Sequence, residues 1–335
     1  MAFSAPHLAE TSRTVTSKRG FFWIPGDTIQ TAYGTVPRGP LYVAWESPEE
    51  VTRPYPLVLI HGGGGQGTDW LGTPDGRPGW AAEFVEAGFA VYVVDRPGHG
   101  RSPHHPEVLG PVSPPFPFEV AQPLFAPADG GDRQTQWPWG RGIEDPEMAQ
   151  LYAGMSFFMA DLAESQELDG LRLGKLLDRI GPAVVVSHSA GSPAGWLLAN
   201  QRPGMVKGIV AVEPMGPPFA EFPGLGPITY GLTYAPVATE PALADPSQLR
   251  ADPASFTISG LAGTPVQVVT GGASPNAAHG PDTVAFLRAV GADAELLHLP
   301  DRGIEGNGHA LILERNSSEA VRPVIEWIAQ LQNAT

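Results

Sequence analysis

Three residue types that can cooperate in acyl transfer occur in this chain in the order serine, glutamate, histidine. They are Ser189, Glu213 and His309, and each lies at or beyond the end of a predicted strand. A serine hydroxyl is a weak nucleophile at neutral pH, so it needs an imidazole to take its proton and a carboxylate to orient that imidazole. These residue types therefore predict nucleophilic catalysis by Ser189, with His309 as the base and Glu213 as the acid.

Ser189 lies at a sharp change of sequence pattern. Residues 181–188 are typical of a short buried strand rich in valine, and residues 192–200 are predicted to form a helix. In a nucleophile elbow the serine occupies the tight turn between such a strand and helix, and the residues two positions before and after it are small. Ser187 and Gly191 meet that requirement, although Ser187 stands where glycine is usual. The alternative interpretation is a buried strand followed by an ordinary serine-capped helix.

The base and the acid are chosen by their positions relative to the predicted strands. His309 is the one histidine among nine that lies beyond the last predicted strand. Glu213 directly follows an apolar strand, and its length allows it to reach the imidazole from the strand next to the elbow. Asp282 is better explained by the favourable dipole at a helix start, and Glu305 is a reserve candidate. His188 is expected to point away from Ser189, toward the pocket edge or the core.

A glycine run at residues 61–67 follows the predicted strand 57–60 and reads His-Gly-Gly-Gly-Gly-Gln-Gly. Glycines allow backbone N–H groups to approach a tetrahedral intermediate closely, so we predict an oxyanion hole formed by Gly63 and Ala190, with Gly64 beside it. A phosphate-binding loop is excluded because the run lacks the Lys-Ser/Thr pair. A dinucleotide-binding loop is excluded because no acidic residue follows at a strand end about 20 residues later.

Buried apolar strands alternate with helices along most of the chain, which predicts an α/β fold with a mostly parallel sheet and helices on both faces. Strands are predicted at 21–25, 41–45, 57–60, 89–94, 181–188, 206–212, 266–270 and 294–299, and the first two are expected to pair antiparallel. Helices are predicted at 80–87, 147–168, 171–180, 192–200, 282–290 and 318–330. In such a sheet functional residues gather at the carboxyl ends of the strands.

Two long loop-rich segments, about 103–145 and 217–261, are predicted to form a lid on a single domain of residues 1–335. Met215 and Phe219 are predicted to bind substrate together with Gly64. The other candidate pocket walls are aromatic residues of the first loop segment, with simple lid packing as the alternative: Phe116, Phe118, Phe125, Trp137 and Trp139. Such walls favour a hydrophobic substrate.

The composition limits the classes of partner. The formal net charge is -15 and no basic patch is visible, which argues against nucleic acid. With no cysteine there is no disulfide and no thiolate metal site, and the mechanism requires no metal or cofactor. Residues 1–20 lack the apolar core of a signal peptide and no run is long enough to span a membrane. We therefore expect a cytoplasmic protein, while a trimmed exported precursor and a homodimer stay open.

These motifs resemble the α/β-hydrolase fold, including the turn Asp95-Arg96-Pro97-Gly98-His99-Gly100-Arg101-Ser102 that is common in that superfamily. More narrowly, the segments 212–219 and 303–317 resemble the bacterial esterase 713 group, whose catalytic acid is a glutamate after the sixth strand. The resemblance covers about residues 21–330. This chain differs in having glycines where that group has cysteines at the oxyanion loop, and no exported N-terminus is visible.

Taken together, the residues predict a serine hydrolase that cleaves a carboxylic ester or lactone of a hydrophobic, including aromatic, substrate through an acyl-enzyme. The alternatives are a C–C bond hydrolase or lyase on the same fold, since a fold alone does not decide the reaction, and a non-catalytic binding protein. The presence of all three members of the triad argues against the binding protein.

Overall fold

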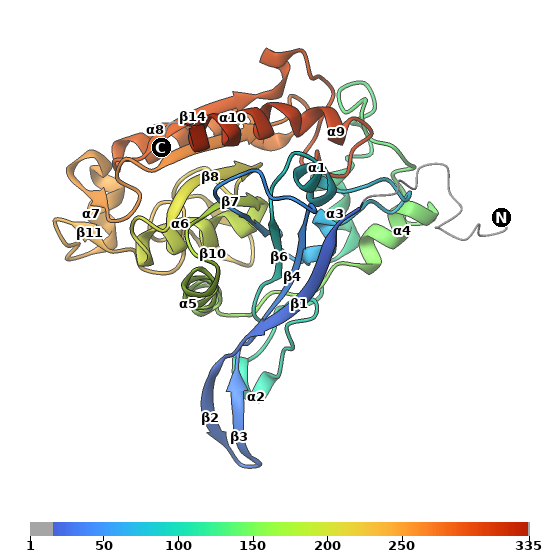
Figure 1. Ribbon diagram of the computed structural model, residues 1–335. Coiled ribbons are helices and arrows are strands. Elements are labelled where there is room, and N and C mark those ends of the chain that lie inside the picture. Colours follow the sequence, from blue (N-terminus) through green and yellow to red (C-terminus); the bar gives the residue numbers. More distant parts are fainter. Residues whose placement is uncertain (1–15, 334–335) are drawn as a thin grey trace.

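The computed structural model describes residues 16–333 and has an eight-stranded central sheet (Figure 1). Residues 1–15 lie outside this range, so most of the segment considered for a signal peptide is not described. The strand order is β1-β4-β6-β5-β7-β8-β13-β14, and the six strands from β6 to β14 are mutually parallel. β4 is antiparallel to both β1 and β6. The predicted α/β fold with an antiparallel start is confirmed.

The strands of this sheet have the following bounds: β1 Lys18–Ile24, β4 Leu41–Ser47, β5 Leu57–Ile60, β6 Val91–Asp95, β7 Ala183–His188, β8 Val206–Val212, β13 Pro265–Thr270 and β14 Asp293–His298. Each predicted strand is present, and most bounds agree to within two residues. Among the described residues, three antiparallel strand pairs lie outside this sheet: β2 Asp27–Thr31 with β3 Gly34–Arg38, β9 Glu221–Phe222 with β10 Gly226–Pro227, and β11 Thr239–Glu240 with β12 Thr257–Ile258. Isolated bridges join Gly72 to Pro78 and Val112 to Met159.

The helices are α1 Trp80–Glu86, α2 Pro106–Leu109, α3 Phe118–Phe125, α4 Pro146–Ala153, α5 Leu162–Ile180, α6 Ser192–Gln201, α7 Pro246–Ala251, α8 Gly280–Ala289, α9 Ser317–Ala320 and α10 Arg322–Asn333. Short 3-10 turns include η2 Gly67–Trp70 and η3 Ser189–Gly191. No helix within the described range is both long enough and apolar enough to cross a membrane.

The two faces of the sheet bury two separate cores, because successive side chains of a strand point to opposite faces. Along β7, Val185 joins the core that is covered by α5, α6 and α8, while Val184 and Val186 join the core that is covered by α1, α9 and α10. β5 alternates in the same way. The central strands are therefore mostly apolar, and polar residues such as Asp95 and His188 lie at their carboxyl ends.

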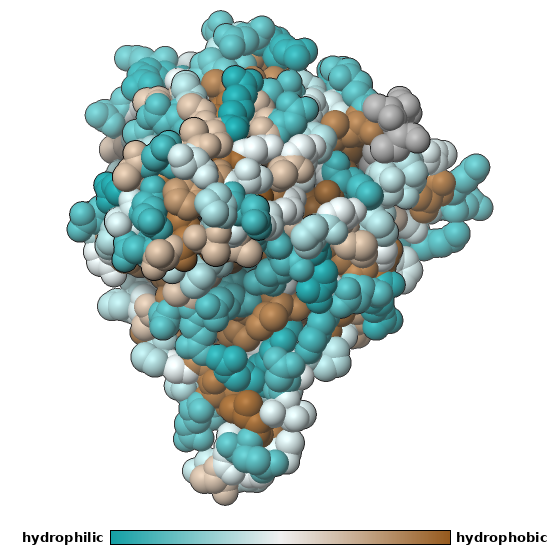
Figure 2. All heavy atoms as spheres, turned by 90° about the vertical axis from the view of Figure 1, so that its left-hand side faces the viewer, coloured by the Kyte–Doolittle hydropathy of each residue, from teal (hydrophilic) through white to brown (hydrophobic). Residues whose placement is uncertain are grey.

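A hairpin of β2 and β3 projects from the lower end of the molecule (Figure 1). These two strands lie between the predicted strands 21–25 and 41–45 and were not predicted. Asp27 pairs with Arg172 and Lys175 of α5, so the hairpin is tied to the body by ion pairs. The side of the molecule that Figure 2 presents is mainly hydrophilic, with hydrophobic atoms in separate areas between polar ones.

The predicted helix at 147–168 is wrong, because the chain there forms two helices separated by residues 154–161. Backbone bonds to distant loops replace the helical ones: Ser156 N–H donates to Gly64 O at 2.6 Å and Ala160 N–H donates to Pro111 O at 2.9 Å. The Asp161 side chain then caps α5. The break expected near residue 170 is absent, because Gly170 lies inside α5 where it packs against Gln201 of α6.

The two predicted lid segments occupy different places. Residues 103–145 form α2, α3 and connecting loops, and their buried Ala126 and Trp137 pack with Met148 and Ala310 in a small core of their own. Residues 217–261 carry Leu232, Val237, Leu249 and Ile258 into the core beneath α6 and α8. Motion of either segment as a lid stays a prediction.

We predict that Gly191→Ala destabilises the protein by about 1–3 kcal/mol, because overpacking a close contact forces the backbone to shift. A Cβ at Gly191 would lie 2.2 Å from the carbonyl oxygen of His61. The measurement is urea denaturation followed by circular dichroism. Gly131→Ala is the matched control, since a Cβ there meets nothing within 4 Å. Equal stability of Gly191→Ala and Gly131→Ala would contradict the prediction.

Candidate active site

Ser189 lies at the turn between β7 and α6, with a backbone φ of 50°. A positive φ is costly for a residue with a side chain and is typical of functional turns. The turn is possible because Gly191 passes directly beneath the His61 carbonyl and Ser187 is small and fully buried. The local structure is therefore the strand–turn–helix that the sequence predicted.

The structure brings the three predicted residues into one chain of contacts. His309 Nε2 lies 3.0 Å from Ser189 Oγ, and His309 Nδ1 lies 3.3 Å from Glu213 Oε2. His309 and Glu213 are buried, whereas Ser189 is partly exposed. Burial lowers the pKa of His309 to about 4, so its ring is neutral at pH 7 and can accept a proton.

Glu213 follows β8 directly, also with a φ of 50°. Its carboxylate accepts a hydrogen bond from Gly271 N–H at 2.6 Å and another from the Ser274 hydroxyl. Burial raises the pKa of Glu213 to about 7, while the bonds from Ser274 and Gly271 act in the opposite direction. Gly271 and Ser274 lie in the loop that follows β13. This loop therefore supplies the hydrogen-bond donors that favour the ionised form of Glu213.

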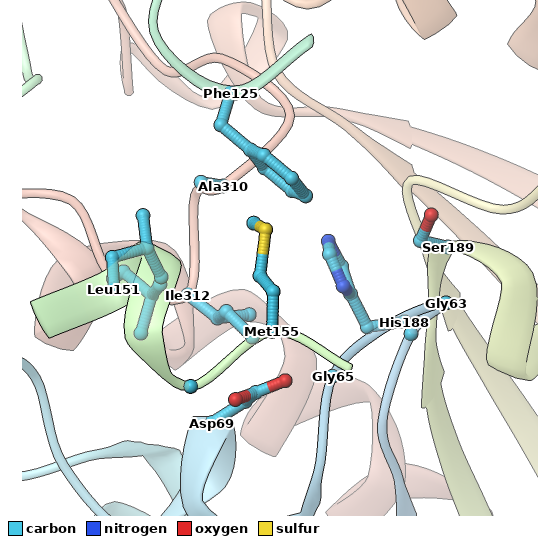
Figure 3. A pocket seen from close by; sticks show the side chains of 13 residues that line it. Gly63, Gly65, Asp69, Phe125, Leu151, Met155, His188, Ser189, Ala310 and Ile312 are labelled. Atoms are coloured by element: carbon cyan, nitrogen blue, oxygen red, sulfur yellow. The ribbon is translucent and has the colours of Figure 1, made fainter. Parts of the chain in front are cut away.

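His188 and Asn276 support the site and were not assigned to it from the sequence. His188 Nε2 lies 2.9 Å from the carbonyl oxygen of His309, so its N–H can hold the backbone of His309. Asn276 Nδ2 donates to Glu213 O at 3.1 Å. His188 points away from Ser189 and toward the cavity described below, as expected (Figure 3). Burial lowers the pKa of His188 to about 3.

The loop that carries His309 is held by a buried carboxylate. Glu314 accepts from the Gly308 N–H at 2.8 Å, from Asn307 Nδ2 at 2.8 Å and from Gln134 Nε2 at 2.7 Å. Burial raises the pKa of Glu314 to about 7, and the hydrogen bonds oppose that shift. Glu314 lies in the segment 303–317 that was noted for its family resemblance, but its spacing from His309 did not show which backbone group it would bind.

The buried side chain of Arg96 also supports the turn at Ser189. Arg96 pairs with Asp169 of α5 at 3.0 Å and donates to Ala190 O at 3.4 Å. Its backbone N–H donates to His61 Nε2 at 3.0 Å. The turn at 95–102, which was noted for its family resemblance, thus connects the glycine run to the helix after Ser189.

The glycine run and the elbow border a small cavity with a volume of about 40 Å³. A Cβ at Gly63 would lie 3.1 Å from the Ala190 Cβ, so the two predicted oxyanion donors are neighbours. The cavity walls also include Phe125 of the first loop segment and Met155, which the break between α4 and α5 delivers (Figure 3). The Phe125 ring centroid is 5.5 Å from that of His309.

Other predicted residues lie elsewhere. Gly64, Met215 and Phe219 do not line this cavity: Gly64 bonds to Ser156, Met215 N–H donates to Ser189 O at 3.1 Å, and Phe219 stacks edge-to-face on Phe286. Their contact with substrate stays a prediction. Of the remaining aromatic candidates, Phe116, Phe118, Trp137 and Trp139 make ring contacts within the loop segment and its neighbours.

The reserve candidate Glu305 and the helix-start residue Asp282 are both exposed, and Asp282 lies in the first turn of α8 as expected. Neither makes a hydrogen bond to His309 in the described part of the chain, whereas Glu213 does. Among residues 16–333 there is also no group of three or more histidine, aspartate or glutamate side chains that could hold a metal ion.

Comparison with known proteins agrees with this fold. The sequence model of the alpha/beta hydrolase fold family matches residues 55–238, which is more than half of the chain. The chain belongs to the alpha/beta hydrolase fold family.

Two curated relatives are similar in sequence. The probable secreted lipase phiG of Fungal sp. (strain ATCC 74256) is 35% identical over 314 residues, which cover 86% of this chain and 85% of that protein. The pimeloyl-acyl-carrier-protein methyl ester esterase of Vibrio atlanticus (strain LGP32) is 28% identical over 165 residues, 49% of this chain and 55% of that protein. Because the first relative is named as secreted, the cytoplasmic location stays a prediction.

Among solved structures, one described as a novel bacterial esterase superposes with a TM-score of 0.71 at 22% identity. The match covers 97% of this chain and 100% of that chain. The similarity confirms the predicted α/β-hydrolase fold over nearly the whole chain, and the names of the matched proteins agree with the predicted resemblance to esterases.

We predict that Ser274→Ala lowers kcat/KM for an ester about tenfold, the scale of a lost hydrogen bond to a charged group. The Ser274 hydroxyl lowers the pKa of Glu213, so its removal raises that pKa. Glu213 then ionises only at higher pH, and the acidic limb of the pH–rate profile moves upward. Ser255→Ala is the control, since it removes an exposed hydrogen bond to Asp252. An unshifted acidic limb would contradict this role of Ser274.

Proposed function

We propose that this protein is a carboxylic ester hydrolase that works through an acyl-enzyme on Ser189. The observation that carries the proposal is the continuous contact from Ser189 Oγ through His309 to Glu213, at 3.0 and 3.3 Å. Relatives named as lipase and esterase support the same class of reaction. The neutral His309 fits the role of base, and the buried Glu213 fits the role of its orienting acid.

In the proposed cycle His309 Nε2 takes the proton from Ser189 Oγ as the oxygen attacks the ester carbonyl. The backbone N–H groups of Gly63 and Ala190 donate to the oxyanion, and one such donor contributes about 3–4 kcal/mol of barrier lowering. His309 then gives its proton to the leaving alcohol. Water, activated by the same imidazole, attacks the acyl-enzyme, releases the acid and restores Ser189.

The residues that line the cavity indicate which class of substrate it would bind. Its walls are mainly glycine backbone and apolar side chains such as Phe125, Leu151 and Met155, which favour a hydrophobic group beside the ester. A lactone is a cyclic ester, so its ring would open by the same steps. The alcohol that leaves the carbonyl carbon would then remain part of the acyl group bound to Ser189.

We predict that Ser189→Ala lowers kcat for p-nitrophenyl esters by about 10⁴-fold or more, because the cycle has no other nucleophile. Turnover is followed by nitrophenolate release over acyl chains from acetate to decanoate. The exposed Ser247→Ala is the control and is expected to retain activity. Wild-type turnover by Ser189→Ala would rule out the proposed mechanism.

Glu213→Gln is predicted to lower kcat by at least 10²-fold with little change in KM, since an amide cannot stabilise the imidazolium in the same way. Glu305→Gln and Asp282→Asn are the matched controls, because both carboxylates are exposed. A loss of activity in either control, with Glu213→Gln unaffected, would move the acid to that residue.

A further inference from the structure

The cavity beside Ser189 contains a carboxyl side chain that the proposed mechanism does not use. Asp69 of η2 lines the cavity together with Ser189, His188, glycines and apolar side chains. In Figure 3 the Asp69 carboxylate and the Ser189 hydroxyl lie apart, with Met155 and His188 drawn between them. A single carboxyl group among apolar walls is the kind of convergent polar group that fixes ligand orientation.

The local backbone leaves room for this carboxyl group. A Cβ at Gly65 would lie 2.2 Å from Asp69 Oδ2, so a larger residue at position 65 would displace it. Oδ2 accepts from the Gln66 N–H at a long 3.3 Å. Within residues 16–333 Asp69 has no ion pair with a cationic side chain, so its hydrogen-bonding capacity is largely unused by the protein.

The neighbouring acid Asp95 is satisfied in a different way. Asp95 accepts from the backbone N–H groups of Gly67 and Arg101, at 2.7 Å each, and pairs with the Arg101 guanidinium. Burial raises the pKa of Asp69 to about 7, the Gln66 N–H lowers it and the charge of Asp95 raises it further. Near neutral pH the Asp69 carboxyl group can therefore both donate and accept a hydrogen bond.

We propose that Asp69 determines substrate specificity by pairing with a hydroxyl group of the substrate, so that the preferred esters are hydroxylated carboxylic esters. This inference rests on the ester hydrolysis proposed above. The apolar walls would hold the carbon chain, and an ester that lacks the hydroxyl would leave Asp69 with only the long bond from the Gln66 N–H. A site built to bind a hydroxyl group discriminates strongly against its absence, because the buried partner then stays unsatisfied.

A hydroxyl group fits this cavity better than an ammonium group. An ammonium ion would have to leave water for walls that are mainly apolar, and its desolvation is repaid only where several groups satisfy it. Asp69 is the one carboxyl group among the described residues that line the cavity. His188 beside it is neutral at pH 7, since burial lowers its pKa to about 3.

The test compares p-nitrophenyl hexanoate with its 3-hydroxy and 6-hydroxy derivatives, positions from which ring closure is slow. The matching methyl ethers and amines complete the series. For the wild type we expect kcat/KM of one hydroxylated ester to exceed that of the parent by about tenfold or more, mainly through KM. The methyl ether should lose most of this advantage, because it cannot donate to the ionised carboxylate and can only accept from the protonated form.

Asp69→Leu should bring the ratio of hydroxylated to parent ester close to one, and Asp69→Asn should restore part of it because an amide also pairs with a hydroxyl. Asp69→Asn keeps an acceptor for the Gln66 N–H and so tests the proposal even if Asp69→Leu fails to fold. Asp245→Asn is the matched control, since Asp245 caps α7 and does not line the cavity. It should keep the wild-type ratio.

Three results would overturn the proposal: no preference for a hydroxylated ester in the wild type, the same ratio in wild type and both Asp69 variants, or a stronger preference for the amine. These differ from failure of the proposed function. Suppose Ser189→Ala abolishes turnover of the parent ester, while the ratio of kcat/KM for hydroxylated and parent ester is the same in the wild type and the Asp69 variants. Ester hydrolysis would then stand, and the proposed role of Asp69 would be wrong. If no ester is turned over, the proposed function itself fails.

Discussion

The close approach of α6 to the loop after β5 is the constraint on which the site depends. Gly191 passes so near the His61 carbonyl that a methyl group would not fit, and this contact fixes the turn that holds Ser189 at a positive φ. The same contact places the glycine run beside Ala190. The positions of the proposed nucleophile Ser189 and of both predicted oxyanion donors thus follow from one packing requirement between a helix start and a strand end, and the two cores on either face of the sheet maintain it.

Burial of the titratable groups around Ser189 has a consistent electrostatic consequence. It lowers the pKa of His309 and His188 and raises that of Glu213 and Glu314. The ionised form of Glu213 then depends on donors from other strands, namely Gly271 and Ser274. A sheet with parallel strands supplies these donors naturally, because the loops after β8 and β13 meet at the same edge.

The sequence was informative where local chemistry demands particular residues. The strand–serine–helix pattern at 181–200, the glutamate after β8 and the histidine after β14 were all predicted, and the structure brings them within hydrogen-bonding distance. Residues that act through tertiary contacts were missed. Ser274, Asn276 and Glu314 look like ordinary loop residues until the fold brings them to the site, and Asp69 was not singled out.

The helix predicted at 147–168 was wrong for the same reason. Residues 147–168 have helical spacing, yet bonds from Ser156 and Ala160 to loops about 90 and 50 residues away interrupt the helix. Local propensity could not reveal partners so distant in sequence. The same interruption brings Met155 to the cavity wall. The wrong helix prediction and the failure to predict Met155 as a pocket residue therefore have one cause.

The central claim is that Ser189 is a nucleophile activated by His309. The most direct measurement is mass spectrometry of the intact protein and its peptides after treatment with a p-nitrophenyl dialkyl phosphate, which phosphorylates activated serines. The account predicts one adduct per chain, located on Ser189, with labelling strongly slowed in His309→Ala. An unlabelled protein, or an adduct on another residue at the wild-type rate in Ser189→Ala, would contradict it.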